Sequence, residues 1–306
     1  MITKKTVLIL GAGASAHLEY PLGKQLVDEI LSAGGTAFWN LLEPHFKRSD
    51  AEKFQEFLRF SDCSSIDEFL RTHEHRAKLG KFLIAHILKQ KESLERPFHP
   101  KDSGWYRHLF DSMLVDGKPD FDKNAISIIT FNYDRSLEAY IHHVLKHRFE
   151  KTEDEATKLL KMIQIIHVHG ILGEYPKTPY RPSTNSAETL AVSELIQTVH
   201  DFPDNPHVFS NDQFKLAHTK IAEAERILFL GFGFHPENLK RFKYFASENA
   251  ADLKQKEIVS TFSDNNSVSR HRLLDRLARE NGLGSIVLPP VPTDCEGFFT
   301  TQTILL

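Results

Sequence analysis

The sequence predicts an α/β fold, in which a parallel sheet has helices on both faces and an inserted helical subdomain. Short, continuous apolar runs alternate along the chain with segments of helical spacing, which is typical of parallel strands buried on both faces. Several of these runs end in glycine-rich or polar turns. The stretch between the first two runs contains too much predicted helix for one crossover, so part of it is expected to form a separate helical layer.

The first strand is expected at residues 7–10, where a short apolar run ends in a glycine-rich turn. Pro21 then opens a pattern of apolar residues at helical spacing, and Gly34 ends it. Residues 36–120 continue with apolar stripes at helical spacing, and residues 65–68 match a capping box at a helix start. We interpret residues 36–120 as the inserted helical layer.

The rest of the chain continues the alternation of strands and helices. Further strands are predicted from apolar runs at residues 125–131, 163–168, 226–230, 257–262 and 285–288. Helices are expected after residue 131, in the charged stretch 150–161, in 187–224 and in 267–279, whereas the prolines of 171–185 predict a loop. The whole chain, residues 1–306, is interpreted as one domain with helical insertions at about 36–120 and 171–224.

Composition excludes several classes of protein. The net charge of −3 gives no broad basic surface, so direct binding of nucleic acid is not expected. No apolar run approaches the ~20 residues that cross a bilayer, and the apolar start is too short for a signal peptide. The two cysteines, Cys63 and Cys295, support neither a disulfide framework nor a cysteine-rich zinc module. A reducing, cytoplasmic setting away from the membrane is therefore expected.

Four predicted strands end in unusual turns. These turns contain Gly11, residues 132–134, His169 with Gly170, and residues 231–233. In an open parallel sheet, ligands bind outside the carboxyl ends of the strands. All four turns are therefore expected along one edge of the sheet, where they would form a ligand site.

The first of these turns has the spacing of a dinucleotide-binding, Rossmann-like fingerprint. Gly11 would make a tight turn, Gly13 would let the backbone approach a pyrophosphate, and the small Ala16 would let a helix pack closely. Backbone N–H groups at such a turn suit a phosphate. A glycine-rich turn without a ligand has the same spacing. The acidic residue that usually binds ribose after the second strand is not obvious, which counts against a standard dehydrogenase.

The polar residues at the other strand ends leave alternatives open. Asn132 and Asp134 either face a ligand or form a turn. His167 and His169 form an H-x-H pair that could bind metal, while an imidazole such as that of His169 could take a proton from a ribose hydroxyl or water. Gly231 and Gly233 allow a close approach of the backbone to a nucleoside, or serve packing alone. Asp264 and Asn265 could contact an adenosine ribose or form another turn.

An ordered set of motifs resembles the sirtuin-like family. The motifs are GAGAS at 11–15, TFNYD at 130–134, HG at 169–170 and GFGF at 231–234. The resemblance spans roughly residues 6 to 290. In addition, SSIDEFL at 64–70 is similar to a segment common in the bacterial branch of the family.

This resemblance implies a fold that binds NAD and breaks its nicotinamide–ribose bond. It implies that Asn132 orders the ribose and the attacking group, that His169 is the catalytic base, and that Asp134 supports the nicotinamide end or Asn132. It also implies a set of cofactor-binding residues, namely Gly11, Ala12, Gly13, Ser15, Thr130, Gly231, Gly233 and Asn265.

Two departures from the family's deacylases shape the functional hypothesis. Those enzymes carry four zinc-binding cysteines after the catalytic histidine, and residues 171–230 contain no cysteine. Their arginine-bearing segment is replaced by HLEYPLGKQL at 17–26, which is similar to NAD-hydrolysing proteins of bacterial anti-phage defence. The leading hypothesis is a zinc-free NAD glycohydrolase that acts as a homo-oligomer and responds to a partner protein or phage-derived trigger. The alternatives are an NAD-dependent protein deacylase or ADP-ribosyltransferase, and a non-catalytic module that senses NAD or ADP-ribose and controls a partner.

Overall fold

The centre of the computed structural model is a five-stranded sheet in which all strands run parallel. The structure describes residues 1–98, 104–197, 212–234, 238–239, 250–262, 269, 271–275, 277, 286–288 and 293–301. The strands are β1 (Thr6–Leu10), β2 (Ile126–Thr130), β3 (Gln164–His167), β4 (Arg226–Leu230) and β5 (Glu257–Ser260). Their spatial order is β3-β2-β1-β4-β5, so the predicted Rossmann-like α/β fold is confirmed.

The strands end level with one another, which brings the four unusual turns to one edge. Leu10 pairs with Thr130 on one side and with Leu230 on the other, and Thr130 pairs with His167. The chain order reverses at β1, between β2 and β4, and ligands of open α/β sheets bind at such a point. The predicted convergence of the turns at one edge is therefore confirmed.

Apolar residues alternate between the two faces of the sheet, and helices cover both. Leu8 and Ile128 belong to one core cluster, whereas Val7 and Ile129 belong to a second. The first cluster is built with helices α1 (Gly23–Ser32), α2 (Thr36–Leu42), α3 (Arg48–Phe60), α4 (Ile66–Thr72), α5 (Ala77–Lys91), α6 (Gly104–Met113), α7 (Ser136–Arg148), α8 (Glu153–Met162), α9 (Ser186–Ser193) and α14 (Cys295–Thr301). The second is built with α10 (Asp212–Glu223) and α12 (Ala250–Leu253). Burial on both faces explains why the strands appear in the sequence as unbroken apolar runs.

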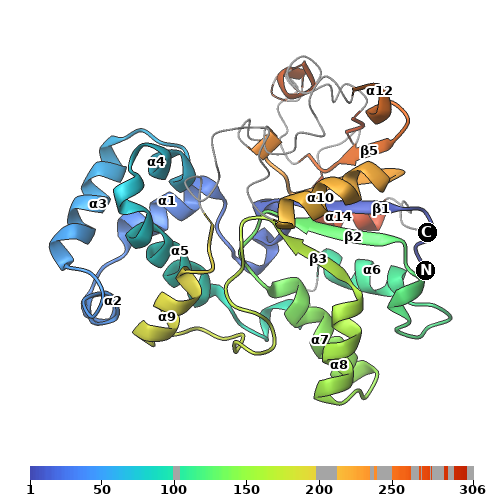
Figure 1. Cartoon of the computed structure of the whole chain (residues 1–306), viewed down its shortest axis with the longest axis horizontal. Helices are drawn as coiled ribbons and strands as arrows, with labels where there is room; N and C mark the ends of the chain where they lie inside the picture. Colours follow the sequence, from blue (N-terminus) through green and yellow to red (C-terminus); the bar gives the residue numbers. More distant parts are fainter. Residues whose placement is uncertain are drawn as a thin grey trace.

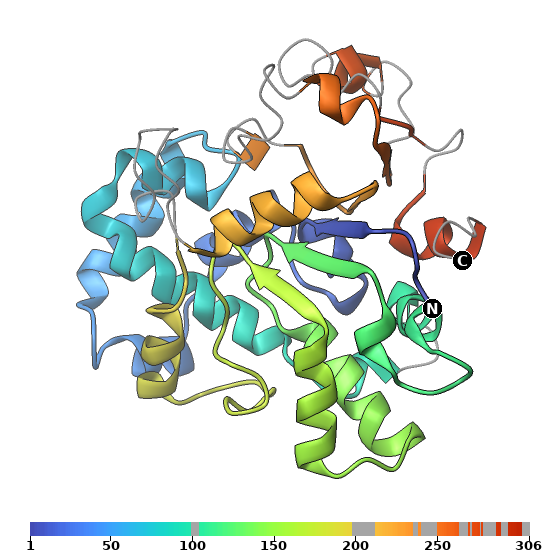
Figure 2. The ribbon, with the colours of Figure 1, turned by 45° about the vertical axis from the view of Figure 1, so that its right-hand side comes forward.

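Helices α1–α5 form a group of their own beyond the carboxyl ends of β1, β2 and β3 (Figure 1). The turned view in Figure 2 shows the same group beside the sheet, with α7 and α8 below it. Helix α5 packs against α1, α4 and α9, and α3 packs against α1. These helices therefore stand where they can cover the ligand edge of the sheet. Within the described ranges, no helix is both long and apolar enough to span a bilayer.

Local hydrogen bonds explain where helices α4 and α8 begin. The Ser65 hydroxyl accepts the Glu68 N–H at the start of α4, and the Glu68 carboxylate accepts the N–H of Ser64 rather than that of Ser65. Thr152 and Glu155 form a complete capping box at the start of α8. The predicted helix of 150–161 therefore begins at Glu153, after Glu150 in the left-handed region with φ of 50°.

Two expectations near the carboxyl end of the chain are only partly met. The predicted strand at 285–288 is reduced to one parallel bridge between Val259 and Val287. Of the predicted helix at 267–279, residues 269, 271–275 and 277 are described and helical. Asp264 and Asn265 lie outside the described residues, as does Ser285.

A cluster of buried charges joins α5 to the turn after β2. The side chains of Arg135, Glu92 and Lys89 have no exposed surface. The Arg135 guanidinium donates to both oxygens of the Glu92 carboxylate, with distances of 2.7–3.0 Å, and the Lys89 ammonium donates to the same carboxylate. Such a bidentate pair stays favourable in the interior only when its remaining hydrogen-bonding groups are also satisfied.

The loop 171–185 supplies the remaining partners of this cluster. Arg135 donates to the carbonyls of Thr178 at 2.7 Å and Pro179 at 3.0 Å, and the Arg181 N–H donates to Glu92 at 3.2 Å. The prolines of this loop were the signal for an irregular segment. The cluster fixes that segment to α5 and to residue 135, directly after the predicted site residue Asp134.

Replacing Arg135 by methionine should therefore destabilise the protein strongly. The variant removes the bidentate donor of the Glu92 carboxylate and the Arg135 hydrogen bonds to the carbonyls of Gly173 and Thr178. Breaking a buried ion pair typically costs about 3–5 kcal/mol. Urea unfolding measures this loss of unfolding free energy. Lys215→Met, which breaks the exposed pair with Asp212 on α10, is the control and should leave the midpoint unchanged. Equal effects of the two variants would contradict a central role for the cluster.

Candidate active site

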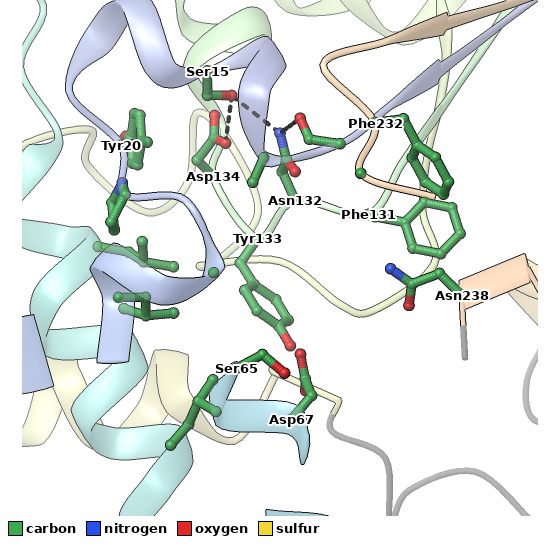
Figure 3. A pocket seen from close by; sticks show the side chains of 18 of the residues that line it. Ser15, Tyr20, Ser65, Asp67, Phe131, Asn132, Tyr133, Asp134, Phe232 and Asn238 are labelled. Carbon is green, nitrogen blue, oxygen red and sulfur yellow. Dashed lines mark hydrogen bonds between the residues drawn. The ribbon is translucent and has the colours of Figure 1, made fainter. Parts of the chain in front are cut away.

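A cavity of about 530 Å³ opens at the carboxyl edge of the sheet, and Figure 3 shows the side chains that face it. This volume lies within the range of about 300–1,000 Å³ that is typical of small-molecule sites. Its walls come from the turn after β1, the end of β2, the start of α1, helix α4 and the turn after β4. The lining residues include Gly11, Ala12, Ser15, Tyr20, Pro21, Ser64, Ser65, Asp67, Arg71, Phe131, Asn132, Tyr133, Asp134, Phe232 and Gly233.

The glycines of the turns after β1 and β4 let the two backbones touch. A Cβ on Gly11 would lie 2.6 Å from the Gly231 carbonyl oxygen, and one on Gly13 would lie 2.8 Å from the Gly231 Cα. Gly231 itself has a φ of 57° and would place a Cβ 2.1 Å from the Ala14 nitrogen. The close approach that was expected at this turn therefore serves contact between two turns of the protein.

The turn after β1 does not lead directly into an α-helix, contrary to the fingerprint. Two short 3₁₀ turns follow, at Ala12–Ala14 and Ala16–Leu18, and α1 begins only at Gly23. The Gly13 N–H donates to the Gly231 carbonyl at 2.9 Å, and the Ala14 N–H donates to the Gly11 carbonyl at 2.9 Å. These two N–H groups already have partners within the protein, and the role of Gly13 in holding a phosphate stays a prediction.

Asn132 is held by hydrogen bonds on its backbone and on its side chain. Its N–H donates to the Thr130 hydroxyl at 3.0 Å, and its carbonyl accepts from His167 at 3.1 Å. Its side-chain Nδ2 donates to the Gly11 carbonyl at 3.0 Å and to Ser15 Oγ at 3.1 Å. The Gly11 carbonyl can only accept, so this contact fixes which end of the amide is the nitrogen. In Figure 3 the nitrogen faces Ser15, which leaves Oδ1 as the acceptor for a ligand in the cavity.

Ser15 links Asn132 to the buried carboxylate of Asp134. The Ser15 hydroxyl donates to Asp134 at 2.8 Å while it accepts from Asn132. Asp134 also accepts from the N–H and the hydroxyl of Ser136, whose oxygen in turn lies 2.6 Å from the Tyr106 hydroxyl. Burial raises the pKa of Asp134 above its usual value, against the opposing effect of the hydrogen bonds from Ser136 and Ser15. Asp134 thus orients Ser15, and through it the amide.

His169 lies at the same edge but outside this cavity wall. Its ring packs against Phe131, with centroids 5.2 Å apart, and against Phe214 of α10 at 5.8 Å. It is buried, and it is not among the residues that line the cavity. Phe131 lines the cavity, so the imidazole is in contact with a residue of the cavity wall. The structure therefore brings Asn132, Ser15 and Asp134 together, and it places His169 at the same edge in contact with Phe131.

The other predicted site residues take different places. Gly233 lines the cavity together with Gly11, Ala12 and Ser15. Thr130 holds the Asn132 backbone, and Gly13 and Gly231 form the contact between the two turns. The role of Asn265 stays a prediction, since it lies outside the described residues.

The two histidines of the H-x-H pair are directed to different neighbours. His167 is bonded to Glu138 of α7 and to the Asn132 carbonyl, whereas His169 packs against Phe214 of α10. Both ring nitrogens of His167 are therefore engaged within the protein. Among the residues that the structure describes, no group of three or more histidine, cysteine, aspartate or glutamate side chains is arranged to hold a metal ion. The geometry does not support a metal site built on His167 and His169.

Comparison with known families decides what kind of domain this is. Residues 126–283, more than half of the 306 residues, match the SIR2-like domain. The chain belongs to the SIR2-like domain family. The matched segment contains Asn132, His169 and Gly231, and the resemblance inferred from the sequence motifs is confirmed at the level of the family. No curated protein matches the chain.

The wall formed by α4 was not predicted as part of the site of this SIR2-like domain. The residues that line the cavity from this segment are Ser64, Ser65, Asp67 and Arg71. In Figure 3, Ser65 and Asp67 lie across the cavity from Asn132, and the Tyr133 ring extends toward them. The capping pattern indicated only a helix start. The similarity of residues 64–70 to a segment of the bacterial sirtuin-like branch was the signal that could have identified this wall.

The contact between the two glycine turns predicts a sharp difference between Gly231 and Gly233. Gly231→Ala should lower the unfolding free energy by more than about 2 kcal/mol, because the left-handed conformation alone costs a residue with a Cβ about 1–2 kcal/mol. Its Cβ would in addition overlap the backbone of Ala14. Gly233→Ala is the matched control, since a Cβ there meets nothing within 4 Å. Thermal unfolding of both variants measures the difference, and similar melting temperatures would contradict this account of the turns.

Proposed function

We propose that this SIR2-like domain is an NAD glycohydrolase, which cleaves the nicotinamide–ribose bond and uses water as the acceptor. SIR2-like domains are NAD-dependent enzymes, and this membership makes NAD the expected substrate. The observation that carries the proposal is the Asn132 amide, whose nitrogen is fixed by Gly11 and Ser15 and whose oxygen is left to accept a hydrogen bond. Such an acceptor suits a ribose hydroxyl or a water molecule beside the ribose carbon.

The reaction needs an environment that stabilises positive charge and orders one water molecule. The bond between the ribose C1′ and the nicotinamide nitrogen breaks, and its electron pair neutralises the pyridinium ring. The water oxygen then bonds to C1′ and releases a proton, so NAD and water give nicotinamide, ADP-ribose and a proton. Preorganised dipoles aimed at the developing charge are the main source of such catalysis. In this proposal the Asn132 oxygen is the dipole and orders the water, while His169 accepts the proton.

Water is proposed as the acceptor because features of the deacylases are missing from the sequence. The chain has only Cys63 and Cys295, so the four-cysteine zinc module that shapes the acyl-peptide channel in those enzymes is not encoded in this chain. The segment 17–26, which starts α1 and borders the cavity, is similar to that of NAD-hydrolysing defence proteins. We therefore propose that the activity serves anti-phage defence by depleting NAD. In this proposal the protein acts in the cytoplasm as a homo-oligomer, and a partner protein or a phage-derived trigger controls it.

Isotope labelling distinguishes hydrolysis from transfer to another acceptor. Purified protein is incubated with NAD in H₂¹⁸O, with and without an acetylated peptide, and products are identified by mass spectrometry. We expect nicotinamide and ADP-ribose in equal amounts, one ¹⁸O atom per ADP-ribose, and an intact peptide. Consumption of the acetyl group in step with NAD would show a deacylase instead. Stable binding of NAD with no product over hours would show a sensing module.

Substitution of the proposed catalytic residues should remove nicotinamide release without unfolding the protein. Asn132→Ala should lower kcat on the order of 10²–10³-fold, as does the loss of one preorganised polar group in other enzymes. His169→Ala should lower kcat on the order of 10²-fold if the imidazole is the base. Circular dichroism and the melting temperature serve as the folding control, and wild-type turnover by both variants would exclude the mechanism.

Loss of the Ser15 hydroxyl should affect catalysis through the orientation of Asn132. Ser15→Ala removes one of the two acceptors of the amide nitrogen and one donor to the buried Asp134. Because small displacements of a positioned group can cost up to about 10²-fold in rate, we expect kcat to fall by about 10- to 100-fold. Ser112→Ala on α6, whose hydroxyl bonds only within its own helix, is the control and should retain wild-type kcat.

A further inference from the structure

His167 bridges the backbone of Asn132 and the carboxylate of Glu138 on helix α7. Its Nδ1 lies 3.1 Å from the Asn132 carbonyl oxygen, and its Nε2 lies 2.6 Å from Glu138 Oε1. The side chains of His167 and Glu138 are only 10% and 11% exposed. His167 does not line the cavity, so it reaches a ligand only through Asn132.

The two partners determine where the protons of this imidazole lie. A carbonyl can only accept, so Nδ1 must carry a hydrogen. Nε2 faces an ionisable carboxylate at short distance, which favours a second hydrogen on that nitrogen and hence the imidazolium form. If Nε2 lost its proton, its lone pair would face the Glu138 carboxylate, and the contact would become repulsive.

The charged groups around His167 favour the same form. Burial lowers the pKa of His167, but the Glu138 carboxylate, the hydrogen bond to the Asn132 carbonyl and the charge of Asp134 raise it more, so the pKa lies above its usual value. For a group whose folded-state pKa is raised, the favourable contribution is complete below the unfolded pKa. It is lost as the pH rises through the folded-state pKa.

We propose that His167 is a positioning residue, whose imidazolium holds the Asn132 carbonyl and thereby keeps the Asn132 side-chain oxygen directed at the ribose. This inference rests on the proposed NAD cleavage and adds a residue and a pH dependence to it. Two hydrogen bonds hold the backbone of Asn132. Its N–H donates to the Thr130 hydroxyl, and its carbonyl accepts from His167. Removal of the second frees the peptide plane between residues 132 and 133 to rotate, which tilts the amide away from Gly11 and Ser15.

The expected signature is an alkaline loss of kcat that depends on Glu138. In the wild type, kcat for nicotinamide release should fall as the pH rises through the raised pKa of His167, with KM for NAD changed less than about twofold. Glu138→Gln lets a neutral imidazole keep its Nδ1 hydrogen on the Asn132 carbonyl while the new amide donates to Nε2. This variant should therefore retain activity at neutral pH and lose the alkaline fall. His167→Leu, which removes the bridge, should lower kcat about tenfold or more.

Two further measurements make the test specific. Glu153→Gln alters a second histidine–glutamate pair, that of His142 with Glu153 between α7 and α8, and should leave kcat and the pH profile unchanged. ¹⁵N NMR of histidine-labelled protein should show hydrogen on both ring nitrogens of His167 at neutral pH in the wild type, and on Nδ1 alone in Glu138→Gln. The NMR result does not depend on turnover.

The outcomes separate this inference from the proposed function. If the wild type releases nicotinamide and Glu138→Gln keeps the wild-type pH profile, the positioning role is excluded while NAD cleavage stands. If His167→Leu does not fold, the pH profile of Glu138→Gln still decides the question. A neutral His167 in the NMR spectrum of the wild type at neutral pH would also exclude the role. A wild-type protein that releases no nicotinamide at any pH would overturn both proposals.

Discussion

The buried contact between Arg135 and Glu92 is the constraint on which the architecture of the site depends. It joins three segments that are distant in the sequence, namely the end of α5, the turn after β2 and the loop 171–185. A guanidinium without exposed surface is stable only when all of its donors are satisfied, and here carbonyls of the loop complete the set. The same turn carries Asn132 and Asp134. The helical layer and the edge of the sheet that borders the cavity are therefore coupled by a buried ion pair as well as by apolar packing.

Around this support, the polar residues of the site form one connected set. Asp134 orients Ser15, Ser15 and Gly11 orient the Asn132 amide, and Thr130 and His167 hold its backbone. Each hydrogen bond restricts the orientation of the next side chain in the set. Together they hold the Asn132 amide in one position. The sequence left open whether Asn132 and Asp134 face a ligand or form a turn. The structure shows the turn, and the contact with a ligand stays a prediction. Asp134 caps the turn through Ser136, and the same carboxylate positions the residues that line the cavity.

The sequence predicted the sheet and its ligand edge well, because fully buried parallel strands appear as unbroken apolar runs and their ends carry glycine or polar residues. Family motifs also led to Asn132, Asp134 and Ser15. Three features could not be predicted in this way. The Arg135 cluster depends on partners more than 40 residues away, as for Arg135 and Glu92 at a separation of 43. The α4 wall depends on how the helical layer packs, and the pairing of His167 with Glu138 depends on the rotation of α7. The fingerprint at Gly11 predicts a close approach of backbone, but its spacing does not reveal that Gly231 makes this approach within the protein.

The backbone contact between the turns after β1 and β4 has a consequence for how a ligand enters the cavity. Gly11 and Gly13 donate to the carbonyls of Leu230 and Gly231, and Gly231 leaves no room for a Cβ against Ala14. These hydrogen bonds hold the turn after β1 against the turn after β4, so the two halves of the sheet are not expected to move apart there. Widening of the cavity entrance is therefore expected on the opposite side, where α4 packs against α1 and α5. In this domain the edge of the β-sheet is the fixed wall of the cavity, and the helical wall opposite is the one expected to shift when a ligand enters.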